Sequence, residues 1–254
     1  MAYNEFAYFY DEFNEDADYQ ALFQAVKEQL HSHGIQDGIV VDLGCGTGDL
    51  TLMLSQAGYD MIGVDLSEEM LAVLREKAAE LEIPDLLLLN QNLLELDLFG
   101  TIRAAVSTFD TFNHIGPLPM FEKAIEKAAF FMEKDGVFLF DVNTPYKHKE
   151  ILGNETFVLE SEDALCVWKN QWQPQQQRTA ISIEIRYHDT GDSFEEEFFE
   201  YYYELEQIRE ICKRYGLRIE QVQDGEDFGP CRPDSQRWFI VAVKEYTQTQ
   251  QQIK

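Results

Sequence analysis

Three glycines stand at every second position in the segment VVDLGCGTGDL, residues 40–50. Glycine lets a backbone turn tightly and lets a ligand approach it closely. Gly44, Gly46 and Gly48 follow a short apolar run and precede an amphipathic stretch. They therefore connect a predicted strand to a predicted helix, which is the place where doubly wound folds bind nucleotide-like ligands.

The spacing of these glycines argues against a bound pyrophosphate. Dinucleotide sites use GxGxxG, in which the third glycine lets the helix pack closely while the pyrophosphate sits on its N-terminus. Asp49 occupies that third position here, and its carboxylate would repel a pyrophosphate. Asp42, two residues before the first glycine, suits a cationic or ammonium-bearing ligand. An NAD-dependent oxidoreductase is therefore the least favoured interpretation.

A further acidic residue indicates a ribose. Asp65 ends the next apolar run, 17 residues after Gly48. In dinucleotide folds an acid at this place accepts hydrogen bonds from the ribose. A ribose without a pyrophosphate, joined to an amino-acid portion, describes S-adenosylmethionine.

The elements that must position these residues alternate along the chain. Short apolar runs predict strands at 39–43, 60–66, 86–90, 103–108 and 136–142, and amphipathic patterns predict helices at 21–30, 48–57, 68–81 and 118–133. Ser67 is the predicted N-cap of the helix at 68–81. Strand–helix alternation of this kind predicts an α/β fold with a parallel, doubly wound sheet.

The alternation breaks in the second half of the chain. Residues 154–203 carry short β-prone runs separated by polar turns, which predicts an antiparallel β insertion that forms a lid over the acceptor. A helix at 204–215 and strands at 217–223 and 237–244 then return to the core pattern. The predicted domains are an N-terminal helical cap (1–34), a ligand-binding core (35–153 and 204–246), the insertion, and a disordered tail (247–254).

Several motifs resemble those of one family. VVDLGCGTGDLTLMLSQAGYDMIGVDLSEEMLAVLREKA is similar to the first two motifs of the Rossmann-like (class I) S-adenosylmethionine-dependent methyltransferases. LNQNLLELDL, VSTFDTFNHI and MEKDGVFLFDVNTPYK resemble the segments around the third, fourth and fifth strands of that family. The resemblance is specific over residues 35–150 and weaker over 204–244, and the opening FAYFYDEFNEDADY resembles the N-terminal cap of small bacterial members. It implies a Rossmann-like seven-stranded sheet of order 3-2-1-4-5-7-6 with the last strand antiparallel.

The resemblance also implies which residues hold the cofactor. It places Asp42 and the three glycines around the methionine portion, Asp65 on the ribose, and Leu66, Asn92 and Leu93 beside the adenine. Asn92 departs from the aspartate that is common in the family, although an amide can still meet the donor and acceptor of adenine. Ser107, Thr108 and Phe109 would line the methyl-bearing end. The whole candidate set is Tyr10, Tyr19, Asp42, Gly44, Cys45, Gly46, Gly48, Asp65, Leu66, Met70, Asn92, Leu93, Ser107, Thr108 and Phe109.

The catalytic residue is not fixed by the sequence. Methyl transfer is an in-line displacement, so a base is needed only if the acceptor must first lose a proton. His114, just past the fourth strand, is a candidate base, and the alternative is a loop histidine that caps a turn. Tyr10 is a second candidate, and the alternative is that it packs as an ordinary residue of the N-terminal helix. Residues 143–146 (NTPY) are interpreted as a turn into the insertion, and no cluster of residues predicts a metal.

The composition of the chain limits the chemical class of the methyl acceptor. The chain has 47 acidic and 20 basic residues and a formal net charge of −27, which disfavours nucleic acid because such binding depends on Lys and Arg. The run FEEEFFEYYYE (194–204) is interpreted first as a strand with one face packed and the other solvated. Its acidic side chains beside aromatic ones would also suit a cationic amine acceptor. No signal peptide or membrane span is predicted, and four scattered cysteines fit the cytoplasm.

The predicted activity is therefore methyl transfer to N or O of a small molecule, by a monomer or homodimer. Two alternatives remain open. One is an RNA or protein methyltransferase, and the other is a regulatory protein that binds S-adenosylmethionine without turnover.

Overall fold

Seven strands form the central sheet of the computed structural model, which describes residues 18–83, 86–161 and 164–245. They are β1 (Ile39–Leu43), β2 (Asp60–Asp65), β3 (Leu87–Asn90), β4 (Ile102–Ser107), β5 (Met132–Asn143), β10 (Leu217–Asp224) and β11 (Arg237–Lys244). Their order is β10-β11-β5-β4-β1-β2-β3. The first five strands are mutually parallel, and β11 lies antiparallel between β5 and β10. This confirms the predicted order and the antiparallel last strand.

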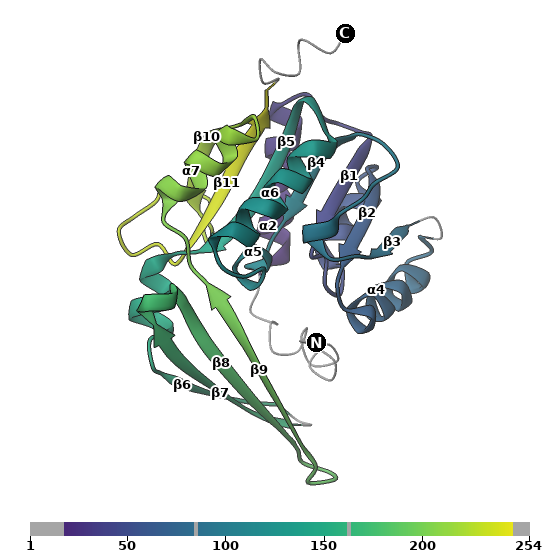
Figure 1. Ribbon diagram of the computed structural model, residues 1–254. Coiled ribbons are helices and arrows are strands. Elements are labelled where there is room, and N and C mark those ends of the chain that lie inside the picture. The colour runs from purple at the N-terminus through teal and green to yellow at the C-terminus, as the bar shows by residue number, and fades with distance from the viewer. Residues whose placement is uncertain (1–17, 84–85, 162–163, 246–254) are drawn as a thin grey trace.

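Helices cover both faces of this sheet (Figure 1). They are α2 (Tyr19–Ser32), α3 (Asp49–Gln56), α4 (Glu68–Glu80), α6 (Leu118–Phe131) and α7 (Leu205–Arg214). Successive side chains of a strand point to opposite faces, so neighbouring residues join different cores. Phe138 and Phe140 pack with α6 and α7 on one face, whereas Val137 and Leu139 pack with α2 and α3 on the other.

The helix that follows β2 begins as the sequence predicts. Ser67 has extended backbone angles, and its hydroxyl accepts a hydrogen bond from Met70 N at 3.1 Å. Glu68 and Glu69 occupy the first turn of α4, where the helix dipole favours negative charge. This cap fixes the direction in which the chain leaves Asp65.

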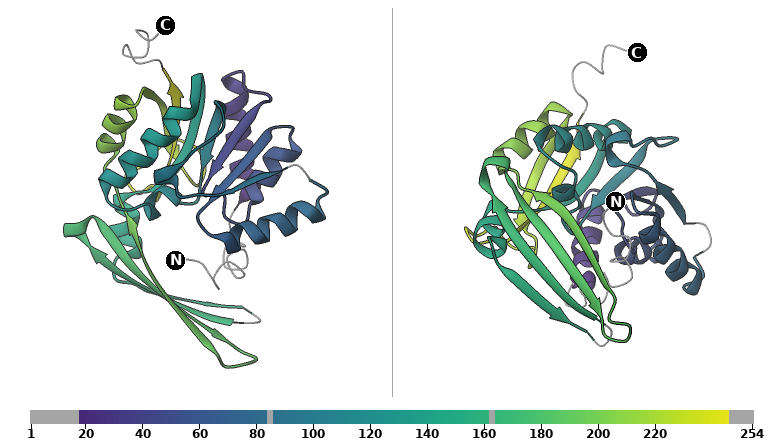
Figure 2. Two further views of the ribbon diagram at one scale, coloured as in Figure 1. Left: turned by 45° about the vertical axis from the view of Figure 1, so that its right-hand side comes forward. Right: turned by 60° about the horizontal axis from the view of Figure 1, so that its bottom comes forward.

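The insertion is a four-stranded antiparallel sheet, as predicted. Its strands, in the order β6-β7-β8-β9, are Thr156–Glu160, Ala164–Gln173, Arg178–Tyr187 and Ser193–Tyr201. Alternate residues of β8 are buried, which is the period-2 pattern of a strand with one covered face. Figure 2 shows this sheet reaching past the carboxyl ends of the central strands, beyond the main body of the domain. It therefore faces the edge at which the glycine loop lies.

Four short helical elements lie between the strands of the described residues. A π-helical segment, η2 (Lys147–Leu152), leads from β5 into the insertion, and α5 (Thr111–His114) follows β4. Two 3-10 turns are η1 (Leu93–Glu95) and η3 (Pro174–Gln176). Within the described ranges, no helix combines the length and apolar character that crossing a membrane requires.

Candidate functional site

A cavity of about 690 Å³ lies between the carboxyl ends of the central strands and the insertion. Gly44, Gly46 and Asp65 line one part of it, and His114 and Glu200 line another. A second cavity of about 40 Å³ adjoins the glycine loop. The predicted cofactor loop and the predicted base thus open into the same space.

The three glycines of the loop have different roles. All have positive φ, +76° at Gly44, +53° at Gly46 and +88° at Gly48, a region that other residues rarely adopt. A Cβ on Gly44 would collide with the Thr111 side chain, and a Cβ on Gly48 would collide with Leu74. At Gly46, no heavy atom lies within 4 Å of a built Cβ. Packing therefore requires the first and third glycines, while the second opens onto space for a ligand.

Asp65 is held at the end of β2 by backbone donors. Gly46 N donates to its Oδ2 and Ser67 N donates to its Oδ1, each at 2.9 Å. Burial raises the pKa of this carboxyl, although the backbone hydrogen bonds act in the opposite direction. Each carboxylate oxygen has a further lone pair, so a hydroxyl in the cavity can still donate to it.

Asp42 lies behind the glycine loop and lines the smaller cavity. The Thr51 hydroxyl donates to its Oδ2 at 2.5 Å. Burial raises the pKa of Asp42 to about 7, against the effect of the Thr51 hydrogen bond and with a further contribution from the charge of Asp65. Its ionisation is therefore sensitive to any cation that enters the loop.

Most other candidates from the sequence also border the two cavities. The larger one is lined by Leu66, Met70, Asn92, Leu93 and Phe109, and the smaller one by Tyr19, Cys45, Gly48, Thr108 and Phe109. Ser107 lines neither; its hydroxyl donates to Leu43 O at 2.6 Å and so joins β4 to β1. Tyr10 lies outside the described residues.

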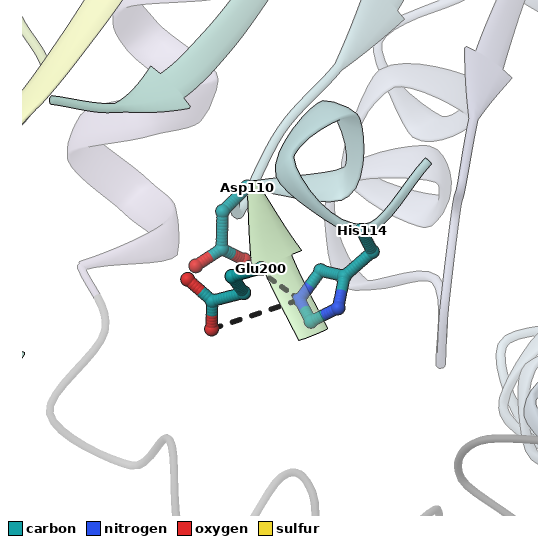
Figure 3. A group of neighbouring side chains, drawn as sticks. All are labelled: Asp110, His114 and Glu200. Atoms are coloured by element: carbon teal, nitrogen blue, oxygen red, sulfur yellow. Dashed lines mark ion pairs between the residues drawn. The ribbon is translucent and has the colours of Figure 1, made fainter. Parts of the chain in front are cut away.

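Two carboxylates that the sequence did not single out face His114. His114 Nε2 lies 3.9 Å from Asp110 Oδ1 and 3.9 Å from Glu200 Oε1. Asp110 follows β4, His114 ends α5, and Glu200 is in β9 of the insertion (Figure 3). We call these three residues the carboxylate–histidine cluster. One ligand atom from each lies within 4.8 Å of the others, so the cluster could hold a metal ion or another cation.

A polar network beneath the cluster fixes its carboxylates. Asn143 Nδ2 donates to Asp110 Oδ2 at 2.6 Å and to Glu200 Oε2 at 3.1 Å. Lys147 Nζ donates to Asn143 Oδ1 at 3.0 Å. The NTPY segment is therefore more than the turn that the sequence suggested, because Asn143 joins the two carboxylates.

The turn that carries Asp110 is conformationally strained. Phe109 and Asp110 have φ of +53° and +55°, which is costly for residues other than glycine. Asp141 offsets this cost, since its carboxylate accepts hydrogen bonds from Phe109 N at 2.9 Å and Asp110 N at 2.7 Å. The surrounding structure thus holds Asp110 in a conformation that the chain would otherwise avoid.

The acids of this region differ in their ease of ionisation. Burial opposes ionisation of Asp110, but Arg237, His114 and Lys147 outweigh it and hold its pKa below the ordinary value. For Glu200, burial and then the charge of Asp110 raise the pKa. Burial, followed by Arg237, lowers the pKa of the Lys147 ammonium. Glu200 is therefore a cavity-lining carboxylate whose ionisation an incoming cation would favour.

Comparison with known proteins gives a consistent identification. A family profile described as a methyltransferase domain matches residues 40–136. A Geobacillus protein provisionally named a methyltransferase is 28% identical over 251 residues, covering 96% of this chain and 100% of its own. The crystal structure of an S-adenosylmethionine-dependent methyltransferase from Clostridium acetobutylicum superposes with a TM-score of 0.87 and 26% identity, covering 97% of this chain and 100% of that one. The chain belongs to the class I S-adenosylmethionine-dependent methyltransferases.

A further solved structure shares the fold of this methyltransferase. The sugar N-methyltransferase KedS8 of Streptoalloteichus is 18% identical, with 93% of each chain covered and a TM-score of 0.76. S-adenosylmethionine is the cofactor of this methyltransferase. Its loop fits that molecule, because Gly46 leaves room beside the backbone and Asp65 presents a carboxylate to the cavity.

Proposed function

We propose that the methyltransferase transfers the methyl group of S-adenosylmethionine to a nitrogen or oxygen of a small molecule. The observation that carries this proposal is the cavity of about 690 Å³ that is lined by Gly46 and Asp65 and also by His114 and Glu200. Its volume is in the range of sites for small ligands, about 300–1,000 Å³. A cofactor at the loop and an acceptor at the cluster would share a water-poor space.

The candidate residues along this cavity would contact different parts of the cofactor. Asp65 would accept from the ribose hydroxyls, Leu66 and Leu93 would contact the adenine, and Asp42 would favour the cationic end of the cofactor. During transfer, the acceptor lone pair attacks the methyl carbon, the C–S bond breaks, and its electron pair stays on the sulfur. The chain supplies position and electrostatics, which account for most of such an acceleration.

The insertion would act as the acceptor lid within the predicted domain division. Five of its residues line the cavity, namely Trp168, Phe198, Phe199, Glu200 and Tyr201. Asn113 Nδ2 of α5 donates to Tyr201 O of β9 at 2.7 Å. The lid base is thus bonded to the element that carries His114. The solved sugar N-methyltransferase with the same fold supports a small-molecule acceptor.

The cofactor site can be tested with two matched glycine substitutions. Gly46 and Gly191 both have positive φ, and neither has a heavy atom within 4 Å of a built Cβ, so valine strains the backbone similarly at both. Only Gly46 lines the cavity. In calorimetry we expect Gly46→Val to lose S-adenosylmethionine and S-adenosylhomocysteine, and Gly191→Val to bind both as the wild type does. Retained binding in Gly46→Val would remove the loop from the site.

The acceptor class can be tested with labelled methyl groups. The wild type should transfer label from S-adenosylmethionine to the small-molecule fraction of a bacterial extract, and His114→Gln should do so at least tenfold more slowly. Label in the RNA or protein fraction would favour the first alternative. Binding of the cofactor without transfer to any fraction would favour the regulatory one.

A further inference from the structure

We infer that the methyl acceptor is the nitrogen of an amine, which binds as a monocation at the carboxylate–histidine cluster. This inference rests on the proposed function and specifies its substrate class. It uses three observations, namely the geometry of the cluster, the charges around it, and the direction in which charge moves during transfer.

The cluster presents three acceptor atoms to one point in the cavity. His114 Nε2 is 3.9 Å from Asp110 Oδ1 and from Glu200 Oε1, and the three ligand atoms lie within 4.8 Å of one another. These separations exceed a hydrogen-bond length, so the atoms surround a space and do not close it. A nitrogen placed beside this triangle would lie within about 3 Å of all three atoms, a distance that suits N–H donors.

The charges around the cluster call for one positive charge. With His114 neutral, as it must be to accept a proton, Asp110, Asp141 and Glu200 contribute three carboxylates, while Lys147 and Arg237 contribute two cations. Arg237 Nη2 lies 4.0 Å from Asp110 Oδ2, and Arg237 Nη1 lies 3.9 Å from Asp141 Oδ2. Lys147 and Arg237 both line the cavity. A monovalent ammonium neutralises the remaining negative charge. A divalent metal would leave an excess positive charge beside two partly buried cations, which is costly where the dielectric is low.

Aromatic side chains of the lid extend the site toward an organic cation. The Phe198 ring lies 5.3 Å from the His114 ring and 6.2 Å from that of Trp168, between ring centroids. All three residues line the cavity. Aromatic faces attract alkylammonium groups through cation–π interaction, and an inorganic ion would gain much less from such a wall.

The charge that develops during transfer distinguishes a nitrogen acceptor from an oxygen acceptor. An ammonium first gives one proton to His114 Nε2, which frees the nitrogen lone pair. That lone pair attacks the methyl carbon, the N–C bond forms, and the C–S bond breaks with its electrons on sulfur. Positive charge develops on the nitrogen, and Asp110 and Glu200 stabilise it. An alcohol would instead have to lose its proton as it attacks, and the two carboxylates would oppose the negative charge on its oxygen.

An amine-selective block separates this inference from the proposed function. A small-molecule extract is acylated with an N-hydroxysuccinimide ester, which consumes primary and secondary amines, and is then offered to the enzyme with methyl-labelled S-adenosylmethionine. We expect at least a tenfold loss of labelled product relative to mock-treated extract. Undiminished labelling after the block would overturn the amine inference and leave the proposed function intact. No labelling in either extract would overturn both.

Two substitutions on strand β9 test the cluster itself. Glu200→Gln keeps an oxygen for Asn143 but removes the charge. The initial rate of label transfer to a fixed amount of the amine-containing extract should therefore fall at least tenfold, while the Kd of S-adenosylmethionine stays within twofold. Glu197→Gln removes an exposed carboxylate from the same strand and should change neither quantity. Equal activity of Glu200→Gln and the wild type would overturn the inference. So would activity that is lost in EDTA and restored by Mn²⁺, because the cluster would then hold a metal.

Discussion

At the scale of single residues, burial determines the protonation state of the Asp42 carboxyl. Its pKa is about 7, against 3.8 for an ordinary aspartate, and burial is the main cause. The folded chain therefore holds more protons than the unfolded chain between these two values. The contribution of Asp42 to the free energy of unfolding therefore falls as the pH rises through this window, because unfolding releases a proton there.

We predict that Asp42→Asn stabilises the protein without cofactor and that the advantage depends on pH. Asparagine keeps an oxygen for the Thr51 hydroxyl and has no charge to bury. Relative to the wild type, the gain in unfolding free energy should grow by about 2 kcal/mol between pH 5.5 and pH 8. Urea unfolding of both chains at each pH measures this, because other titrating groups cancel in the difference. Parallel pH profiles would contradict it, and the variant should also bind S-adenosylmethionine more weakly.

The sequence predicted those candidate site residues that lie close to one another along the chain. Gly44 to Asp65 form one contiguous pattern, and that spacing alone indicated a ribose-containing ligand without a pyrophosphate. Asp110 and Glu200 are 90 residues apart, and in a chain with 47 acidic residues no local signal distinguishes them. Only the packing of β9 against α5 brings them together. The spacing of two between Phe198 and Glu200 was a hint, because alternate residues of a strand share a face and an apolar Phe198 marks that face as the covered one. Both residues are buried in β9.

At the scale of elements, the sequence predicted the strands and most helices but not their junctions. It placed a helix to residue 133 and a strand from 136, whereas α6 ends at Phe131 and β5 begins at Met132. Both residues are buried and apolar, so periodicity could not separate the two elements. The helix α5 was missed because it is one turn long and begins after Asp110, whose left-handed backbone gives no side-chain cap.

The same short helix is held by the chain that leaves the lid. The hydroxyl of Tyr203, just after β9, lies 3.0 Å from Phe112 O and 2.6 Å from Gly116 O. Tyr203 is buried, and its single hydroxyl proton can be donated to either of these two carbonyls. The position of His114 is thus linked to the lid through buried hydrogen bonds.

We predict that Tyr203→Phe lowers stability and turnover together. Loss of the hydroxyl should cost about 1–3 kcal/mol of unfolding free energy because it leaves buried carbonyls unpaired. It should also reduce kcat several-fold, with little change in cofactor affinity, since α5 becomes less well fixed. Tyr59→Phe is the matched control, because the Tyr59 hydroxyl donates to Ile35 O at 3.2 Å in the core between α2 and β1. It should lower stability comparably and leave kcat unchanged, and equal kcat losses in both variants would refute the link.

At the scale of the whole molecule, the net charge of −27 surrounds every site with a negative potential. Such a field concentrates cations and repels anions, and dissolved salt screens it over about 10 Å at 0.1 M. S-adenosylmethionine and S-adenosylhomocysteine, the two ligands of the cofactor site, differ in net charge. S-adenosylmethionine carries a sulfonium that its demethylated product lacks, so the substrate is a net cation and the product is neutral overall.

We predict that the two ligands respond differently to ionic strength. Between about 20 mM and 500 mM salt, the Kd of S-adenosylmethionine should rise about three- to tenfold, while that of S-adenosylhomocysteine should change less than twofold. Calorimetric titrations at constant pH measure both, and the product serves as the control because it shares every contact except those of the methylsulfonium. Equal salt dependence would show that local contacts, such as the Asp42 and Asp65 carboxylates, determine cofactor binding without help from the overall charge. A larger response for the substrate would mean that the acidic surface favours exchange of spent product for fresh cofactor, and that this preference weakens as the salt concentration rises.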